Sequence, residues 1–288
     1  MAPVLSPSEK RSRPAGGRAA GAALARFAPG TPFWRVNREW LVILGGARAV
    51  LLELAHPLVA EGVARHSRYR ADPFGRLFRT VRTMTDLTFG GPGAARRAAQ
   101  ALGRCHRPVR GQLAEACGPF PAGTEYDAAD PFLKLWVLAT LIDSVLRVYE
   151  LFVAPLTAAE KEAYYREAQA LGPGVGLSPA LMPATYADFA AYMDAMLASD
   201  LLTVGPAARD IVRALYGAPV FGSLAWRASF VSVGLLPPAL RAAFGFEWTE
   251  RDERWLRRLA AWSRRLRPQL PDLFLVYPTA LWSEWRKV

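Results

Sequence analysis

Apolar residues recur at intervals of three and four along most of the chain after residue 33, and strict alternation of apolar and polar residues is scarce. This period places apolar side chains on one face of an α-helix, so it predicts helices and no convincing strand. We expect a single all-α domain over residues 31–288, built as a bundle of about ten helices. Residues 1–30 are rich in Ala, Gly, Ser, Pro and Arg, which predicts a disordered tail.

Capping residues mark the ends of several predicted helices. Threonine followed three positions later by an acidic residue can satisfy the free backbone groups at a helix start. This pattern occurs at Thr157 with Glu160 and at Thr185 with Asp188. A further helix is predicted to begin at Thr249 and to end before Pro268, with one face made of Trp255, Leu256, Leu259, Trp262 and Leu266.

One long apolar segment, residues 40–64, raises the question of a membrane span. It contains Arg48, Glu53, His56 and Pro57, and charged groups are costly inside a bilayer. The segment therefore favours a buried pair of helices, broken at His56 because a helix is disfavoured just before proline. The N-terminus has no uninterrupted apolar core of the kind found in signal peptides.

The composition narrows the class of protein only modestly. The chain has 288 residues, of which 52% are hydrophobic, and its formal net charge is +11. Only four of the 36 basic residues are lysines, so the charge reflects a general excess of arginine and indicates nucleic-acid or anionic-membrane binding only weakly. Cys105 and Cys117 are spaced for neither a zinc site nor a disulfide framework, which is simplest to explain by a reducing cytoplasm.

The chain contains three histidines, His56, His66 and His106. On a continuous helix, His106 would lie in an apolar stripe with Leu102, Val109 and Leu113, and Pro108 would kink that helix. A histidine there is either a core residue bonded to the backbone or a metal ligand, and the spacing alone favours the core role. His56 is expected at a buried helix end and His66 near an exposed one. No histidine pair has the spacing of a zinc site.

A polar stripe runs along the otherwise apolar segment 75–85. Arg76, Arg79, Thr80 and Thr83 fall at spacings of three, four and seven, so they share one helix face. The usual explanation is a face turned to water. If the helix is buried, however, each guanidinium needs an anionic partner, which the carboxylates of a cofactor could supply. A threonine beside an arginine could also orient a polar diatomic molecule such as O₂.

Short motifs follow one another along the chain in a specific order. They are Gly46-Ala47-Arg48, Leu51-Leu52, Ala55-His56-Pro57, Gly62-Val63, His66-Ser67, Asp72-Pro73, Gly75-Arg76-Leu77, Arg79-Thr80, Phe89-Gly90, His106, Val109, Gly111, the run Tyr126 to Pro131, Trp136-Val137, Pro155-Leu156-Thr157 and Tyr164-Tyr165 with Glu167. Over residues 33–240 this series resembles the MpaB-type and rubber oxygenase family. The resemblance implies an all-helical, globin-reminiscent fold that encloses a pocket for haem b.

The resemblance also implies roles for single residues. It makes His106 the axial ligand of the haem iron and places Arg76, Arg79 and Thr80 on the distal wall, with Arg79 and Thr80 acting on bound oxygen. By the same resemblance Arg48, His56 and His66 are further candidates for contact with the cofactor. Arg79 stands where the rubber enzymes have a lysine, and arginine does not lose its proton in proteins. The sixth iron position is therefore expected to be empty or filled by water or His66.

These observations leave three functional hypotheses. The first is a cytoplasmic haem b-dependent oxygenase that uses O₂, and an unknown electron donor, on a small apolar substrate such as an isoprenoid or another alkene. Rubber itself is not expected as the substrate, because the chain has no export signal. The second is a haem-binding carrier or gas sensor without turnover. The third is a basic helical protein for nucleic acid or a membrane surface, although the helix 249–267 more simply packs against the domain. We expect neither sequence-specific nucleic-acid binding nor a transmembrane span.

Overall fold

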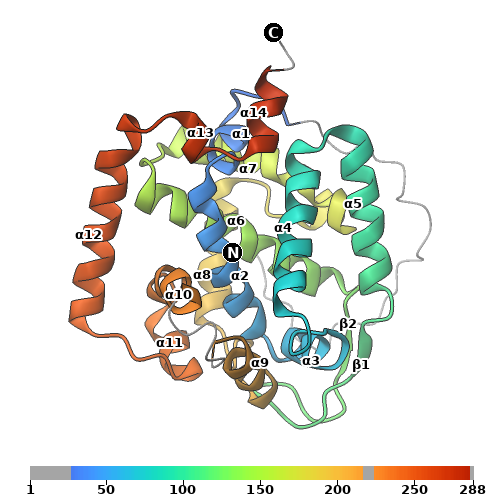
Figure 1. Ribbon diagram of the computed structural model, residues 1–288. Coiled ribbons are helices and arrows are strands. Elements are labelled where there is room, and N and C mark those ends of the chain that lie inside the picture. The colour runs from blue at the N-terminus through green and yellow to red at the C-terminus, as the bar shows by residue number, and fades with distance from the viewer. Residues whose placement is uncertain (1–26, 217–223, 286–288) are drawn as a thin grey trace.

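The computed structural model describes residues 27–216 and 224–285, and helices account for most of them (Figure 1). The helices are α1 (Pro32–Asn37), α2 (Leu44–Leu54), α3 (Pro57–His66), α4 (Pro73–Phe89), α5 (Gly91–His106), α6 (Pro131–Phe152), α7 (Ala158–Ala168), α8 (Tyr186–Ala198), α9 (Pro206–Tyr216), α10 (Leu224–Gly234), α11 (Pro238–Phe244), α12 (Glu250–Leu266), α13 (Asp272–Leu275) and α14 (Pro278–Trp285). Short 3₁₀ helices are η2 (Trp40–Ile43), η3 (Gln169–Leu171), η4 (Pro173–Val175), η5 (Pro179–Leu181) and η6 (Arg267–Gln269). The predicted helical class is confirmed.

Two features differ from the expected count of elements. The described residues hold fourteen α-helices, more than the ten predicted, because elements such as α13 have a single turn and show no hydrophobic period. They also hold two strands, β1 (Arg110–Gln112) and β2 (Glu125–Asp127), which pair antiparallel with Gly111 opposite Tyr126. Each strand is three residues long, too short to produce a detectable alternation.

The centre of the molecule is formed by α6, with α2 packed along it (Figure 1). Close approach of these helices depends on Gly45. A Cβ atom at this position would lie 2.8 Å from the carbonyl oxygen of Ser144, so any side chain would force α2 and α6 apart. Large side chains such as Leu51, Leu52 and Trp136 are almost fully buried around this contact.

The long apolar segment folds as predicted into two helical arms that meet at His56. The segments Trp40–Leu54 and Pro57–His66 are bent by 105° relative to each other. His56 occupies the N-cap position of α3, and Pro57 is its first helical residue, where a missing N–H costs nothing. Within the described residues, no single helix is long and apolar enough to cross a membrane.

The predicted helix starts are also present. Thr157 with Glu160, and Thr185 with Asp188, form complete capping boxes, and Thr249 caps α12 through Asp252. Trp255, Trp262 and Leu266 share one face of α12 as predicted, but Leu256 lies on a different face. Leu256 and Ala260 are buried, but Trp255, Trp262 and Leu266 are exposed, because only one side of α12 contacts the rest of the protein.

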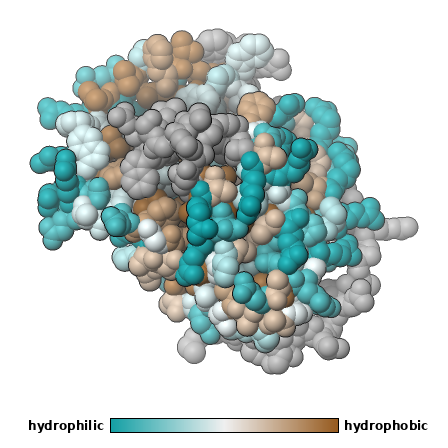
Figure 2. Space-filling view, turned by 60° about the horizontal axis from the view of Figure 1, so that its bottom comes forward, coloured by the Kyte–Doolittle hydropathy of each residue, from teal (hydrophilic) through white to brown (hydrophobic). Residues whose placement is uncertain are grey.

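The predicted tail, residues 1–30, lies almost entirely outside the described residues. Phe27 is buried, and its ring stacks on that of Phe33 with the centroids 4.1 Å apart. The packed part of the chain therefore includes Phe27. On the face shown in the space-filling view, turned so that the bottom of the molecule comes forward, hydrophilic and apolar side chains are intermixed (Figure 2).

Candidate functional site

The C-terminal turn of α5 carries His106, and the helix ends there. Pro108 cannot donate a backbone hydrogen bond, so the helix stops before the proline instead of continuing through a kink as predicted. Val109 donates its backbone N–H to the carbonyl oxygen of His106 at 2.9 Å and then turns away to contact Gly62 of α3. The expected apolar stripe is therefore wrong: Val109 and Leu113 follow the helix and do not share a helix face with His106.

The imidazole of His106 is available to a ligand. The side chain is exposed, and it makes no hydrogen bond or ion pair to any side chain that the structure describes. The surrounding protein nevertheless lowers the pKa of His106, chiefly by removing water from the charged form and secondly through the nearby Lys134 ammonium. The ring is accordingly neutral at pH 7, the state in which a histidine nitrogen can bind a metal.

Lys134 reaches this region from the first turn of α6. Its Nζ atom donates to the carbonyl oxygen of Gly176, 3.1 Å away, which anchors the ammonium beside the loop after η4. Partial burial lowers the pKa of Lys134, while Asp127 and Asp130 act in the opposite direction. Sequence patterns gave no sign of this lysine, because it enters the site from a helix far from His106 in the chain.

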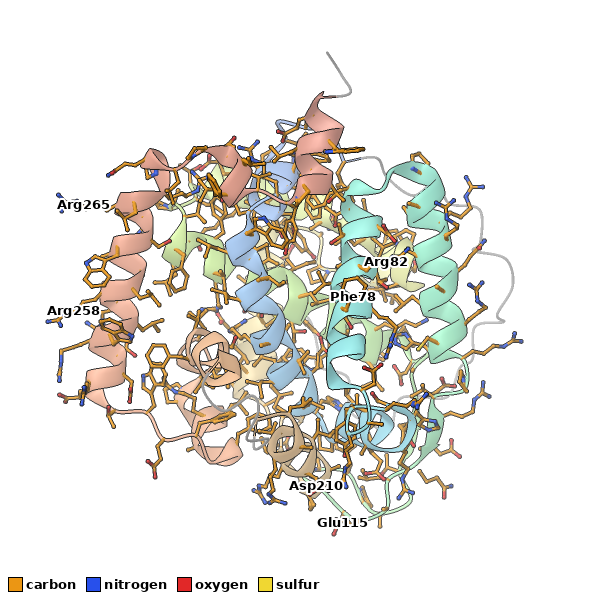
Figure 3. The ribbon with its side chains drawn as sticks, in the orientation of Figure 1. Phe78, Arg82, Glu115, Asp210, Arg258 and Arg265 are labelled. Carbon is orange, nitrogen blue, oxygen red and sulfur yellow. The ribbon has the colours of Figure 1, made fainter. Side chains whose placement is uncertain are left out.

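In the polar stripe of α4, Arg79 and Thr80 are exposed and Thr83 is half-buried. The Nη1 atom of Arg79 is 2.9 Å from Oδ2 of Asp72. The side chain of Arg76 lies outside what the structure describes. Phe78 is 67% exposed and, with Arg82, marks the outer side of the helix (Figure 3). For Arg79 and Thr80 the usual explanation, a face turned to water, therefore holds, and Arg79 does not require a cofactor as its partner.

Asp72 was missed by the sequence analysis as a site residue, although the Asp-Pro pair at 72–73 is a helix-start signal. Its Oδ1 atom accepts the backbone N–H of Gly75 at 2.8 Å and so caps α4. The bond from Arg79 and the bond from Gly75 together lower the pKa of Asp72. One carboxylate therefore fixes both the start of α4 and the position of the Arg79 guanidinium.

The helices α4 and α5 are antiparallel neighbours joined by a tight turn at Gly90 and Gly91 (Figure 1). The first half of α4 consequently lies beside the second half of α5. With a rise of about 1.5 Å per residue, Arg79 and Thr80 are level with the last two turns of α5, within roughly 10 Å of His106 along the axis. The predicted ligand and the predicted distal residues therefore lie on the two neighbouring helices of one hairpin.

Arg48 has a different environment from the other candidates. It is almost fully buried, and its Nη1 atom lies 2.7 Å from both Oδ2 of Asp143 and the hydroxyl of Ser144. Its Nε atom donates to the carbonyl oxygen of Leu235 at 2.9 Å. Burial lowers the pKa of Arg48, and Asp143 opposes that effect. These contacts tie α2 to α6 and to Leu235, the residue after α10, and leave Arg48 a structural part of the core.

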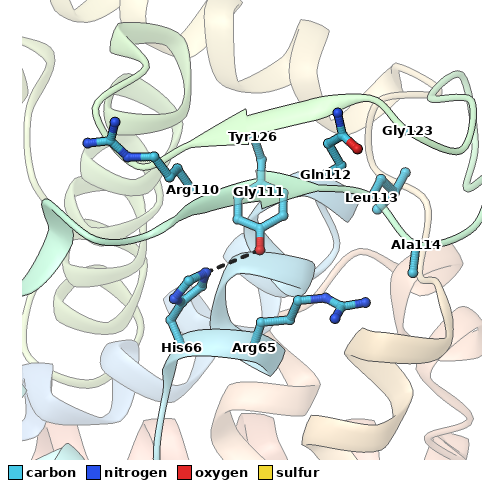
Figure 4. A pocket seen from close by; sticks show the side chains of 9 residues that line it. All are labelled: Arg65, His66, Arg110, Gly111, Gln112, Leu113, Ala114, Gly123 and Tyr126. Carbon is cyan, nitrogen blue, oxygen red and sulfur yellow. Dashed lines mark hydrogen bonds between the residues drawn. The ribbon is translucent and has the colours of Figure 1, made fainter.

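The contacts of His66 and His56 differ from those of His106. His66 Nε2 is 3.2 Å from the hydroxyl of Tyr126. It lines an open cleft of about 680 Å³ together with Arg65, Arg110, Gly111, Gln112, Leu113, Ala114, Gly123 and Tyr126 (Figure 4). The buried ring of His56 packs 5.2 Å from that of Phe120. His106 does not line the His66 cleft.

The donor set decides which kind of metal centre the residues suit. No group of three or more His, Cys, Asp and Glu residues that could hold a metal ion occurs among the described residues. A haem iron needs only one or two protein ligands, because the porphyrin supplies the other four. A single neutral histidine with arginines on the neighbouring helix fits that requirement, since the propionates of haem are anionic and pair well with guanidinium groups.

Comparisons with known proteins give the same family as the motifs. A family model described as "ER-bound oxygenase mpaB/B'/Rubber oxygenase, catalytic domain" matches residues 34–265, which reaches into α12. Uncharacterized proteins of Mycobacterium bovis and Mycobacterium tuberculosis are each 28% identical to the chain over 252 residues, covering 82% of this chain and 94% of the relative. No solved structure matches the chain.

Proposed function

We propose that the protein is a haem b-dependent oxygenase. The chain belongs to the family of mpaB-type and rubber oxygenases, and membership of this family supports an oxygenase-type activity. In this proposal it acts with O₂ on a small apolar substrate, such as an isoprenoid or another alkene. The observation that carries the proposal is His106: a neutral, accessible imidazole with no described hydrogen-bond partner, on the helix that packs against α4, which carries Arg79 and Thr80.

In the proposed holoprotein, His106 ligates the iron, and Arg76 and Arg79 of α4 are candidates to pair with the propionates. When bound, haem supplies the redox chemistry that activates O₂, which no amino-acid side chain can perform. His106 suits this role because its lowered pKa keeps the nitrogen lone pair free of a proton at neutral pH. Arg48 is left out of the proposed contacts, since it is almost fully buried and its guanidinium contacts Asp143, Ser144 and Leu235.

The residues of α4 have separate tasks in this proposal. The hydroxyl of Thr80 can donate a hydrogen bond toward an oxygen-containing ligand, and Arg79 can stabilise negative charge as it develops there. To do so Arg79 would share its guanidinium between Asp72 and the ligand, which its several donors allow. The exposed ring of Phe78 offers apolar surface on the same half of the helix, but turned outward, so we do not assign it to substrate.

Oxygen uptake tests the proposal. The purified protein is supplied with haem, an artificial reductant and a short isoprenoid alkene, and O₂ consumption is followed with an electrode. We expect uptake that depends on the alkene and that disappears in His106→Ala. Haem binding without alkene-dependent uptake would favour the carrier or gas-sensor hypothesis. A protein that binds no haem would contradict both.

A further inference from the structure

The outer face of α12 is a mixed surface of tryptophan, leucine and arginine. Its inner face packs against the domain: Leu256 and Ala260 are buried, and the Ser263 hydroxyl donates to the carbonyl oxygen of Phe152 at 2.8 Å. The opposite face carries six exposed residues at steps of three and four, which therefore form one stripe. We call this the α12 outer stripe: Arg251, Trp255, Arg258, Trp262, Arg265 and Leu266.

The two tryptophans of this stripe are unusually accessible for their size. Trp255 is 47% exposed and Trp262 is 55% exposed, and their rings meet edge to face with centroids 5.9 Å apart. Large aromatic side chains are normally mostly buried, and exposed ones that gather together mark interaction sites. The pair presents a continuous indole surface to the outside of the molecule.

The three arginines of the stripe form no ion pair with the described residues. Arg254 and Arg257, on the flank of α12, form ion pairs with Glu250 and Glu253 four residues earlier. No described acidic residue pairs with Arg251, Arg258 or Arg265, and the last two project away from the molecule (Figure 3). In the view of Figure 2, hydrophilic side chains accordingly dominate the left-hand edge, where α12 lies.

The apolar part of this surface continues beyond the end of the helix. Leu270 follows η6, and Leu273 and Phe274 belong to the single turn α13; the last two are 67% and 69% exposed. None of these three side chains is buried, and the next buried residue along the chain is Val276. A run of exposed leucine and phenylalanine thus adjoins the end of the stripe.

We propose that the α12 outer stripe, with Leu270, Leu273 and Phe274, binds the surface of an anionic lipid bilayer. Tryptophan is enriched at the boundary between headgroups and acyl chains, where its apolar ring and its N–H group are both satisfied. Arginines on the same face attract anionic headgroups, and leucine and phenylalanine can insert below them. The helix would lie in the plane of the interface, and this inference is independent of the haem proposal.

Two other partners fit this surface less well. A nucleic acid would pair with the arginines and could stack on tryptophan, but it offers nothing apolar for Leu266, Leu270 or Phe274. A second copy of the chain docked through the same stripe would set Arg258 and Arg265 against identical arginines, and like charges at an interface oppose binding. A bilayer with anionic headgroups satisfies both the charged and the apolar parts of the surface.

Vesicle flotation with the full chain tests the proposal. We compare vesicles of phosphatidylcholine alone with vesicles that also contain phosphatidylserine, at about 0.1 M and about 1 M salt, where the screening length falls from about 10 Å to about 3 Å. We expect binding to the phosphatidylserine vesicles at low salt, and weaker binding in the other conditions. Absence of binding to phosphatidylserine vesicles at low salt would overturn the proposal.

Two variants and two matched controls locate the binding surface. Arg258→Glu/Arg265→Glu should weaken vesicle binding by on the order of tenfold or more, since each basic residue near an anionic surface contributes to attraction. The control, Arg96→Glu/Arg97→Glu, makes the same charge change on exposed positions of α5 and should bind more tightly than the α12 variant. Trp255→Ala/Trp262→Ala should also lose binding, whereas Leu181→Ala, at an exposed leucine of η5, should not.

The same measurements identify the outcomes that contradict the proposal. Equal losses in the α5 and α12 charge variants would mean that only net charge matters. Normal vesicle binding by Trp255→Ala/Trp262→Ala would show that the two tryptophans do not contribute to binding. Quenching of wild-type tryptophan fluorescence by bromine-labelled lipid is independent of the variants, and its absence would also count against the proposal. Single-stranded DNA binding without vesicle binding, or a dimer that dissociates in Trp255→Ala/Trp262→Ala, would assign the surface to another partner.

Discussion

The Nη1 atom of Arg79 lies 2.9 Å from Oδ2 of Asp72, so the arginine assigned to the distal wall is paired with the residue that caps its own helix. This pair explains how an exposed arginine can be held in place without a cofactor. It also sets a condition on the proposed function, because Arg79 must share its guanidinium with Asp72 to act on a ligand.

Acid sensitivity should reveal the Asp72–Arg79 pair. Arg79 and Gly75 lower the pKa of Asp72, so the carboxylate stabilises the fold above its unfolded pKa of about 3.9, and this contribution is lost as the pH falls through the lower folded pKa. Asp72→Asn keeps a good cap but removes the charge. Between about pH 4 and pH 2, the urea midpoint of the variant should therefore fall less steeply than that of the wild type. Identical slopes would mean that the pair does not form in solution.

Substitutions in α4 should affect oxygen chemistry more than haem retention. A hydrogen bond made only in the transition state is worth about 1 to 3 kcal/mol, so Thr80→Ala and Arg79→Ala should lower turnover by roughly ten- to a hundredfold. Both variants should keep the haem absorption band. The control is Arg166→Ala on α7, an exposed arginine that pairs with Glu162 four residues earlier, and it should leave turnover unchanged. Haem content and single-turnover O₂ consumption measure the two effects.

If Thr80→Ala and Arg79→Ala turn over normally, the stripe does not face the oxygen-binding side. Arg79 would then have only the structural role with Asp72 that the geometry already explains. Arg76→Ala belongs in the same series, because an arginine paired with a propionate should lower haem content as well as turnover.

Local signals predicted much of the fold, because they act within a few residues. Capping at Thr157, Thr185 and Thr249 and the break at His56 depend only on neighbouring residues, and all are present. Burial was predicted less well. The apolar period of α12 does not tell which side meets the core, so Trp255 and Trp262 were expected on a packed face and are exposed.

The candidate site shows the same division between local and distant information. The order of the motifs predicted His106 and Arg79 as site residues. It did not predict Lys134 of α6, which approaches His106 only after folding. The predicted continuation of the helix past His106 was wrong, because Pro108 ends the helix instead of kinking it. Arg48 matched a motif, yet its partner Asp143 lies 95 positions away and no local pattern reveals their buried contact.

The contact between α2 and α6 should distinguish two adjacent glycines. Gly45→Ala places a Cβ atom 2.8 Å from the Ser144 carbonyl oxygen and should destabilise the protein by about 1 to 3 kcal/mol. Gly46→Ala meets nothing within 4 Å and should stabilise the helix by about 0.5 to 1 kcal/mol. Urea unfolding of both variants measures the difference, and equal effects would contradict the close approach of the two helices.

Arg48 should prove to be a structural residue. Arg48→Met removes the buried one of the two arginines that pair with Asp143. It should lower the unfolding free energy by about 3 kcal/mol. Arg147→Met removes the other, more exposed partner of Asp143 and should cost less than about 1 kcal/mol. The folded Arg48→Met protein should still take up haem with the wild-type spectrum. A folded variant that loses haem would instead return Arg48 to the cofactor site.

The absorption spectrum of the purified protein, with and without His106, tests the central claim most directly. The account predicts that the wild type, isolated with haem or reconstituted with it, shows a Soret band. His106→Ala should lose the band or shift it grossly, because the iron loses its protein ligand, while His66→Ala and folded His56→Ala should keep the wild-type spectrum. A His106→Ala protein with an unchanged Soret band, or a folded wild type that takes up no haem, would contradict the account.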